Sequence, residues 1–276
     1  MRNRLSAVLL VVGLAAAAPA PACIAQASSR GTAPESSWVR HSAIYEVFVR
    51  DFSRSGNFRG VIQGLDRIQA VGANVVWLMP IYPVGIANRK GTLGSPYAVR
   101  DYLAVNPEFG TLADFKALVK AVHARGMKLI LDWVPNHTAW DNVWVQQHPS
   151  FHVRDASGGL TVPRDDKGNL TDWTDVAQLN YKNPEMRRAM IDAMRHWLVQ
   201  LDIDGFRMDA AGFVPDDFWQ EALPQVRASV KRPIMLLAEW GDVKMHRFGF
   251  DLTYAWDSYS RLKAVWDSVP ASRFVE

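Results

Sequence analysis

The stretch Gly205-Phe206-Arg207-Met208-Asp209-Ala210-Ala211 closes a predicted strand, residues 203–208, with charged and small residues. An arginine two residues before an aspartate projects its side chain to the same side of a strand as that aspartate. A guanidinium there keeps the carboxylate ionised and oriented, which suits a nucleophile. The alternative is a structural Arg–Asp pair at a strand end, since perturbed ion pairs are often only structural. Three other stretches of the chain favour the first interpretation.

Buried strands alternate with amphipathic helices along the chain, and this order predicts parallel βαβ units. The predicted strands are residues 43–49, 74–79, 128–134, 203–208, 234–238 and 250–254. The predicted helices are residues 61–71, 112–122, 184–201, 216–230 and 256–266. No Gly-x-Gly-x-x-Gly follows the first strand, so nucleotide binding at a Rossmann-type turn has no support. Polar residues end nearly every strand, which is typical of a (β/α)8 barrel.

Six βα units are found where a closed barrel needs eight. Residues 138–180 are polar and turn-rich and form a predicted small domain inserted after the third strand. We therefore predict an α/β chain of the (β/α)8 TIM-barrel type that is incomplete, with barrel parts at 28–137 and 181–276. Because Glu276 comes directly after a helix, the chain is interpreted as a fragment.

The N-terminus has the pattern of a secretory signal peptide, residues 1–27. Arg2 and Arg4 precede a short apolar run at 5–18, and Ala25-Gln26-Ala27 supplies the cleavage site. An uncleaved membrane anchor is the alternative, but the run is short for a span. We expect a secreted or periplasmic protein that loses Cys23, its single cysteine, and so has no disulfide.

Composition excludes several classes of partner. The chain is 49% hydrophobic, with a net charge of +3 spread without long runs, so it resembles a folded globular protein with no nucleic-acid footprint. No later apolar run is long enough for a membrane span, so no membrane partner is expected after signal cleavage. No organic cofactor is predicted.

Two further strand ends carry candidate chemistry. Glu239 ends the apolar run Leu236-Leu237-Ala238 beside Trp240, an environment that should raise its pKa as a general acid requires. An exposed strand-terminal glutamate is the alternative. The stretch Asp132-Trp133-Val134-Pro135-Asn136-His137 ends the third strand and can grip a polar ligand, or be a capped strand end with a satisfied histidine. In the loop after the second strand, Tyr97 either offers a flat face to a sugar ring or packs on the core.

These motifs, in this order, resemble conserved regions of the alpha-amylase family of glycoside hydrolases (family 13). The three strand-end motifs are residues 132–137, 205–211 and 236–240, and residues 94–111 resemble the family's strand-two loop. The likeness runs from about residue 44 to residue 250. It implies a (β/α)8 barrel with a small domain inserted after the third strand.

The resemblance also implies roles for individual residues. Asp209 would be the nucleophile that forms a glycosyl-enzyme intermediate, Glu239 the general acid and then base, and Arg207 the residue that orients Asp209. Two carboxyls serving a retaining mechanism should lie about 5–5.5 Å apart. The implied substrate-binding residues are His137, Tyr97, Asp101, Phe213 and Trp240.

The chain also departs from the family pattern. The third catalytic carboxylate of the family lies in an Asn-His-Asp motif, and none follows Glu239 here. Phe213 stands where many starch-active members carry histidine, which would alter the acceptor side. Asn136 matches a frequent calcium ligand, yet Gln178 replaces a ligating aspartate and removes a charged oxygen from the site. Calcium with Asn136 as ligand therefore remains only a candidate.

The predicted function is a retaining glycoside hydrolase of α-glucosidic bonds in starch-type α-glucans or maltooligosaccharides, with carbohydrate as its partner. One alternative is a transglycosylase or isomerase of the same family acting on a disaccharide. The other is an inactive, truncated carbohydrate-binding remnant.

Overall fold

The computed structural model describes residues 37–165, 167–267, 270 and 272. The predicted signal peptide, residues 1–27, lies outside these residues. Of the helices in the described part, none is both long and apolar enough to cross a lipid bilayer.

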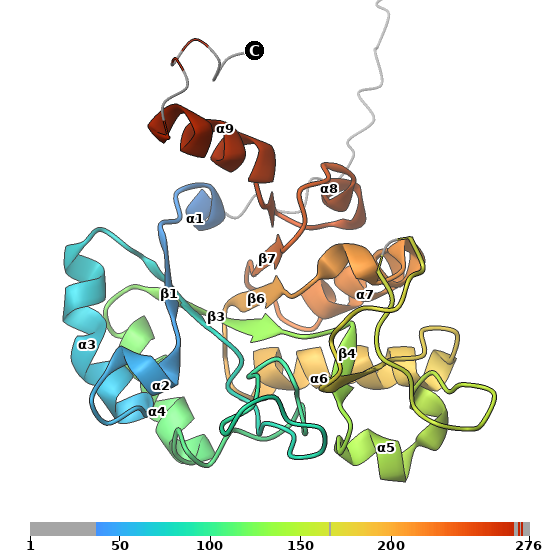
Figure 1. Ribbon diagram of the computed structural model, residues 1–276. Coiled ribbons are helices and arrows are strands. Elements are labelled where there is room, and N and C mark those ends of the chain that lie inside the picture. Colours follow the sequence, from blue (N-terminus) through green and yellow to red (C-terminus); the bar gives the residue numbers. More distant parts are fainter. Residues whose placement is uncertain (1–36, 166, 268–269, 271, 273–276) are drawn as a thin grey trace, which may run out of the picture. The chain divides into compact units, whose positions relative to one another are not determined.

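Six parallel strands form one curled sheet, and their order in the sheet follows their order in the chain (Figure 1). They are β1 (Ile44–Val47), β2 (Val75–Leu78), β3 (Lys128–Trp133), β6 (Gly205–Met208), β7 (Met235–Ala238) and β8 (Leu252–Thr253). A doubly wound sheet reverses its strand order at a switch point, whereas a barrel does not. The prediction of an incomplete (β/α)8 barrel is therefore confirmed.

Helices α3 and α4 flank the β1–β3 end of the sheet, and α6 and α7 flank its other end (Figure 1). The helices longer than one turn and a half are α3 (Phe58–Ala70), α4 (Leu112–His123), α6 (Pro184–Gln200), α7 (Asp216–Ala228) and α9 (Trp256–Trp266). The shorter ones are α1 (Ser37–Arg40), α2 (Val49–Phe52), α5 (Val143–Gln147) and α8 (Lys244–Phe248). Helix α6 begins where the sequence predicts, because Asn183 accepts a hydrogen bond from the Glu185 N–H (2.8 Å) and Pro184 fits the first turn.

Two predicted boundaries are wrong by part of a turn or more. The predicted strand 43–49 ends at Val47, and helix α2 begins at Val49, which is itself buried. Val49 is therefore apolar because it is buried in the core and not because it belongs to the strand. The predicted helix 61–71 begins earlier, at Phe58, because the Asn57 side chain caps it by accepting from the Gly60 N–H (3.0 Å).

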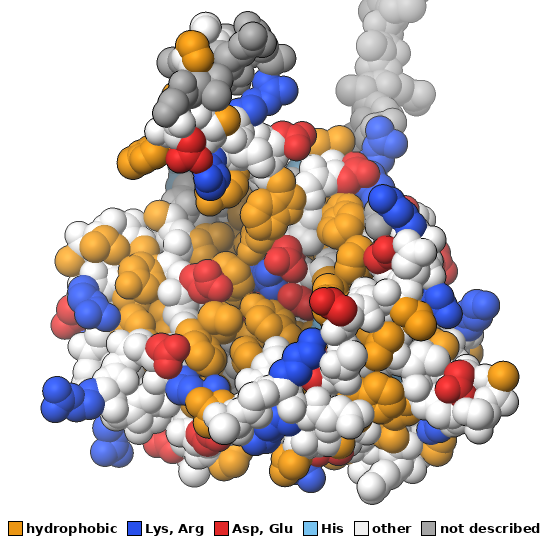
Figure 2. All heavy atoms as spheres, in the orientation of Figure 1, with side chains coloured by type: hydrophobic (Ala, Val, Ile, Leu, Met, Phe, Trp, Pro, Cys, Tyr) orange, Lys and Arg blue, Asp and Glu red, His pale blue; other side chains and the backbone are white. Residues whose placement is uncertain are grey.

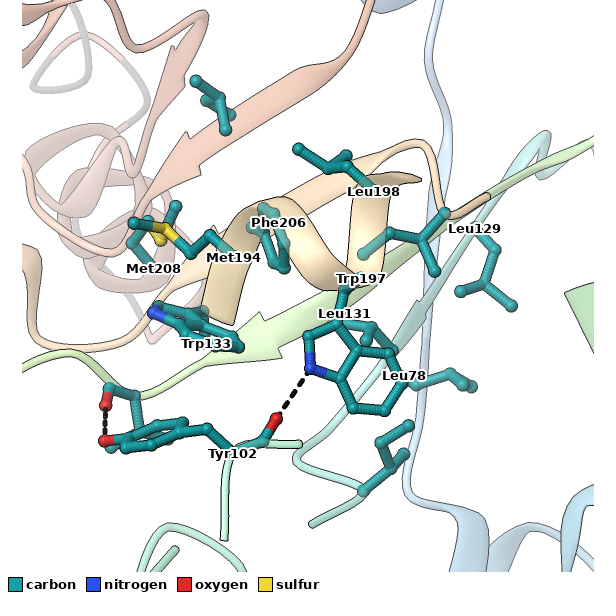
Figure 3. Packing of buried hydrophobic residues seen from close by; sticks show 14 of the residues in the cluster. Leu78, Tyr102, Leu129, Leu131, Trp133, Met194, Trp197, Leu198, Phe206 and Met208 are labelled. Carbon is teal, nitrogen blue, oxygen red and sulfur yellow. Dashed lines mark hydrogen bonds between the residues drawn. The ribbon is translucent and has the colours of Figure 1, made fainter. Parts of the chain in front are cut away.

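The outer face of the sheet packs against the helices and forms the main core (Figure 3). Successive strand residues point to opposite faces, so alternate positions of β3 and β6 face α6. The residues labelled in this layer include Leu129, Leu131 and Trp133 of β3, Phe206 and Met208 of β6, and Met194, Trp197 and Leu198 of α6.

The long loop between β2 and α4 is anchored to this core by Tyr102 (Figure 3). The Trp197 indole N–H donates to the Tyr102 carbonyl (2.7 Å), and the Tyr102 hydroxyl donates to the Val134 carbonyl (2.6 Å). Both side chains are fully buried. The loop that carries Tyr97 is therefore fixed on the barrel at a point five residues further on.

The inner face of the sheet is apolar toward the start of the strands and polar toward their ends. Val75, Ile130 and Met235 form a second cluster, against which Trp38 and Val39 of α1 pack. Further along the same face the side chains become charged, beginning with Asp132 and Arg207. Inward positions that switch from apolar to charged place functional groups at the carboxyl ends of the strands.

Residues 137–180 contain a second, antiparallel sheet of β4 (His137–Ala139) and β5 (Val176–Gln178). Between these strands, two consecutive hairpins repeat the same hydrogen bonds. In each, an aspartate (Asp155, Asp165) accepts backbone N–H groups two and four residues on, and the preceding arginine donates to the carbonyl of the glycine four residues on. Because residues 35–276 form one compact unit, a separate domain at 138–180 stays a prediction.

Candidate active site

Arg207 lies at the centre of a cluster of three carboxylates. Its guanidinium binds Asp132 and Asp209, each at 2.9 Å, and forms an ion pair with Glu239. Asp132 is fully buried, whereas the Glu239 side chain keeps 28% of its exposure. One cation therefore serves three acids in a largely buried place, which leaves the cluster short of positive charge.

Sheet register brings this cluster together. Asp132 of β3 and Arg207 of β6 are register partners, and neighbouring residues of parallel strands point to the same side. The backbone continues this pairing beyond the strands, because the Asp209 N–H donates to the Trp133 carbonyl (2.8 Å) and the Glu239 N–H to the Met208 carbonyl (3.0 Å). Asp209 and Glu239 therefore follow adjacent strands at the same edge of the sheet.

The turn after Asp209 is strained and holds Glu239. Ala210 has φ 44° and ψ 41°, a left-handed conformation that is uncommon for a residue with a side chain. Its N–H donates to the second carboxylate oxygen of Glu239 (2.8 Å). Backbone strain of this kind clusters at functional sites, where the surrounding structure maintains it.

Aromatic rings surround the Arg207 guanidinium. Its central carbon lies 5.1 Å from the ring centroid of Trp77, 6.0 Å from that of Tyr97 and 5.7 Å from that of Tyr254. The Trp77 indole and the Tyr97 hydroxyl also donate to Asp132, and Arg207 donates to the Tyr254 hydroxyl (3.3 Å). These contacts restrict the guanidinium to one orientation.

The charge balance differs from the one predicted from sequence. Burial raises the pKa of Asp209 to about 7, against the lowering by Arg207, and the charge of Glu239 adds to the rise. Burial likewise raises the pKa of Asp132 well above its usual range. The expectation that Arg207 keeps Asp209 ionised is corrected, since the guanidinium is shared and the site is buried.

The expected apolar setting of Glu239 is also wrong. Its carboxylate contacts the Arg207 guanidinium and the Ala210 N–H. Only the strand that precedes it, Met235–Ala238, is apolar and buried.

A cavity of about 370 Å³ opens over the two carboxylates, and we call it the central cavity. Figure 2 shows acidic side chains around basic ones in the middle of this face, bordered by hydrophobic side chains. The central cavity is lined by Lys90, Ser95, Tyr97, His137, Trp173, Asp175, Val176, Asp209, Ala210 and Glu239. A larger cavity, about 1210 Å³, lies against the N-terminal turns of α6 and α7 and includes neither carboxylate.

His137 is a neutral wall of the central cavity. Burial lowers the pKa of its imidazole to about 4, against the opposing charge of Asp175. Its ring meets Trp173 edge-on, with centroids 5.5 Å apart. One nitrogen of a neutral imidazole donates a hydrogen bond and the other accepts one, which suits a hydroxyl ligand.

The structure brings together most of the predicted site residues. Asp209, Glu239, His137 and Tyr97 line the central cavity. Arg207 forms ion pairs with the first two of these residues. Phe213, in the 3-10 turn η2 (Ala211–Phe213), touches Trp173 and Trp240, with ring centroids 5.7 Å and 5.4 Å apart. Because Trp173 lines the central cavity, the two predicted substrate-binding residues Phe213 and Trp240 lie beside it.

Asp101 is not brought to the central cavity. Its carboxylate accepts the Leu103 N–H (2.8 Å) within its own loop. Asp101 does not line the central cavity, so its predicted role in binding sugar stays a prediction.

Calcium at Asn136 stays a prediction. Asn136 is buried and its amide nitrogen lies 3.4 Å from the His137 ring, while the Gln178 side-chain oxygen accepts the Arg164 N–H (2.9 Å). In the part of the chain that the structure describes, no three His, Cys, Asp or Glu side chains gather in a group able to hold a metal ion. The Gln178 amide supplies no charged oxygen, and its carbonyl oxygen is already used by the Arg164 N–H.

Sequence reasoning missed several residues of the site and did not foresee that Asp132 binds Arg207. Asp132 was part of a quoted motif, and its position on the same strand face as Arg207 was a usable signal. The other four come from loops or distant strands and had no local signal. They are Trp77, Lys90, Asp175 and Tyr254.

Comparisons with known proteins agree with this geometry. The family model described as alpha amylase, catalytic domain, matches residues 27–160 and 170–242. Trehalose synthase/amylase TreS of Mycobacterium tuberculosis is 37% identical over 231 residues, which is 71% of this chain and 37% of that protein. Alpha-amylase 3 of Dictyoglomus thermophilum is 30% identical over 230 residues, which is 74% of this chain and 44% of that protein.

Solved structures give the same result. An alpha-amylase from Lactobacillus plantarum superposes with a TM-score of 0.78 at 41% identity, over 86% of this chain and 58% of that one. The maltogenic alpha-amylase AmyB of Thermotoga neapolitana superposes with a TM-score of 0.74 at 39% identity, over 86% and 54%. The chain thus spans about two fifths of the first curated relatives and little more than half of these structures.

Proposed function

Since the chain belongs to the alpha-amylase catalytic-domain family, we propose that it carries the nucleophile and the acid/base of a retaining glycosidase of α-glucosidic bonds. The proposed substrates are starch-type α-glucans and maltooligosaccharides. The observation that carries the proposal is that Asp209 and Glu239 bind one guanidinium and line the same cavity. Aromatic rings beside them offer flat faces to sugar rings.

In this mechanism Asp209 attacks the anomeric carbon while the bond to the leaving oxygen breaks. Glu239 gives that oxygen its proton. Glu239 then takes a proton from water, whose oxygen displaces Asp209 and restores the original anomeric configuration. Arg207 contacts both carboxylates, so it can keep them aligned through both steps.

Replacing Glu239 by Gln tests the proposal. We expect turnover of maltooligosaccharides to fall by roughly 10²–10⁴, because the amide cannot exchange the proton. Stopped reducing-sugar assays of the purified chain provide the measurement. Glu221→Gln is the control, since that glutamate pairs with Arg187 away from the central cavity. Wild-type turnover in the Glu239→Gln chain would remove the assignment.

Transfer to a sugar acceptor is the second candidate, because the same glycosyl-enzyme serves hydrolysis and transfer. It is favoured by a relative named trehalose synthase/amylase and by the aromatic rings of Phe213 and Trp240 beside Glu239. Product analysis after incubation with maltooligosaccharide, sucrose and trehalose separates the two. New disaccharides that are not fragments of the substrate indicate transfer, whereas glucose, shorter maltooligosaccharides and, from sucrose, fructose indicate hydrolysis.

We also propose that the chain is exported, on the strength of Arg2, Arg4 and the apolar run that follows them. The expected mature N-terminus is Ser28. Mass spectrometry of protein recovered outside the cytoplasm measures it. A retained Met1 in that fraction would contradict the proposal.

A further inference from the structure

Two separate chain segments each form a wall of the central cavity. Lys90, Ser95 and Tyr97 belong to the loop between β2 and α4. Trp173 and Asp175 belong to the segment that precedes β5. Asp209 and Glu239 line the same cavity, so a sugar that fills it meets residues of both segments.

A charged pair joins the two walls. The Lys90 ammonium lies 3.4 Å from Asp175 and also donates to the Asp172 carbonyl (3.0 Å). The Asp175 side chain is only 7% exposed, whereas that of Lys90 is 50% exposed. The lysine therefore reaches across from solvent to a carboxylate buried in the opposite wall.

The contact between Lys90 and Asp175 leaves both groups able to form further hydrogen bonds. A buried carboxylate is costly unless it is paired and hydrogen-bonded, and charge-assisted N–H···O bonds are normally about 2.7–2.9 Å long. At 3.4 Å the Lys90–Asp175 contact is longer than that. A hydroxyl can donate to the carboxylate and accept from the ammonium at the same time, so a sugar hydroxyl suits both partners.

We propose that Lys90 and Asp175 close one end of the central cavity and bind the hydroxyls of a terminal sugar, so that the site takes the ends of α-glucan chains and not their interiors. A chain interior would have to pass between two segments that the pair holds together. The volume of about 370 Å³ is near the small end of ligand sites, which agrees with a short stretch of sugar.

The rest of the substrate has room in a neighbouring cavity, because the Phe213 ring contacts Trp173 of the central cavity and also lines that neighbour. A second cavity of about 480 Å³ is lined by Gly212, Phe213 and Trp240. A side chain at Gly212 would meet the Trp240 ring, since an added Cβ would lie 2.0 Å from it. The absence of a side chain at Gly212 therefore leaves room for the Trp240 ring beside this second cavity.

The inference rests on the proposed function, and its test uses linear and cyclic α-glucans of equal glucose number. Binding of maltoheptaose and β-cyclodextrin to the Glu239→Gln chain is measured by calorimetry, and turnover of both is measured with the otherwise unchanged chain. β-Cyclodextrin has no chain end. We expect maltoheptaose to bind at least about tenfold more tightly than the ring, and Lys90→Ala and Asp175→Asn each to abolish this preference.

Arg100→Ala is the matched control. Arg100 and Asp141 form an ion pair of the same length, 3.4 Å, between the same β2–α4 loop and the turn that follows β4, and neither residue lines the central cavity. Its removal should leave the preference for the linear glucan unchanged. A similar loss of preference in Arg100→Ala would show that losing any ion pair of the β2–α4 loop has this effect, and would overturn the inference.

The remaining outcomes separate the inference from the proposed function. Equal binding of ring and linear glucan by the Glu239→Gln chain overturns the inference and leaves the glycosidase proposal intact. Preferential binding of maltoheptaose, lost in Lys90→Ala, without turnover of either glucan supports the inference and removes the proposed activity. Binding of neither glucan overturns both.

Discussion

Asp209, Glu239 and Asp132 share the single guanidinium of Arg207, and this ratio decides how the site titrates. Three acids cannot all remain ionised beside one buried cation at a low cost. The raised pKa values of Asp132 and Asp209 follow from that excess of acid together with burial. The two raised pKa values therefore belong to the Asp132–Asp209 pair and not to either residue alone.

Stability should therefore fall with rising pH through the titration of Asp209. Its folded pKa, about 7, lies above the usual value of 3.8, so the folded chain binds more protons than the unfolded one between those values. The favourable contribution is complete at acid pH and is lost as pH rises through about 7. Each unit of raised pKa corresponds to about 1.4 kcal/mol. We expect Asp209→Asn to gain stability over the wild type at pH 8 but not at pH 4.

Urea unfolding of both chains across this pH range measures the effect. Asp192→Asn is the control, because the Asp192 side chain is 68% exposed on α6. If Asp209 is the nucleophile, activity on maltooligosaccharides should also rise as pH approaches about 7 from below. Parallel stability curves for Asp209→Asn and the wild type would contradict the raised pKa.

At the scale of elements, the contact between β6 and β7 depends on Gly205. This residue begins β6 with φ +148°, and a Cβ there would lie 1.9 Å from the Met235 carbonyl oxygen. The same strand carries Arg207, and β7 leads to Glu239. A glycine at the start of β6 therefore lets β6 and β7 approach closely at that point.

Gly205→Ala should destabilise the fold by several kcal/mol, on the order of 2–5, because the backbone conformation and the carbonyl contact both oppose a side chain. Chemical denaturation measures this loss. Gly126→Ala is the matched control, since Gly126 also has positive φ (+70°) but no atom within 4 Å of an added Cβ. It should cost only about 1–2 kcal/mol. Equal losses in the two variants would show that the close approach to Met235 is not needed.

For the whole molecule, the described sheet is open at both ends. β1 and β8 are its outer strands, and unpaired strand edges invite pairing with other chains. Helix α9, which follows β8, exposes large apolar side chains at Trp256, Tyr259, Leu262 and Trp266, the last 87% exposed. Contiguous exposed apolar residues of this kind favour association.

The chain of 276 residues should therefore self-associate as its concentration rises. Replacing Leu262 and Trp266 by Glu together should weaken this association by about tenfold or more, because charge replaces the apolar surface. Sedimentation velocity over a range of concentrations provides the measurement. Val199→Glu is the control, an exposed apolar residue on α6. A monomer at every concentration would contradict the prediction.

The sequence by itself determined the kind of fold and the motifs of the site. Alternation of apolar strands and amphipathic helices is a local property, and so are the caps at Asn183 and the residues that end each strand. For that reason the six parallel strands, the family resemblance and the positions of Asp209 and Glu239 at neighbouring strand ends could be predicted before any coordinates. The two hairpins at 154–160 and 164–170 also share a sequence pattern, since each begins with Arg-Asp and ends with Leu.

Only the tertiary structure decided how the groups share charge and space. The pairing of Asp132 with Arg207 requires the register of β3 and β6, and the contact of Lys90 with Asp175 joins residues 85 positions apart in the chain. The same structure turned Asp101 into its own loop and placed Glu239 in an ion pair instead of an apolar pocket. Burial and long-range pairing set pKa values and cavity walls, and neither can be derived from residues that are neighbours only in sequence.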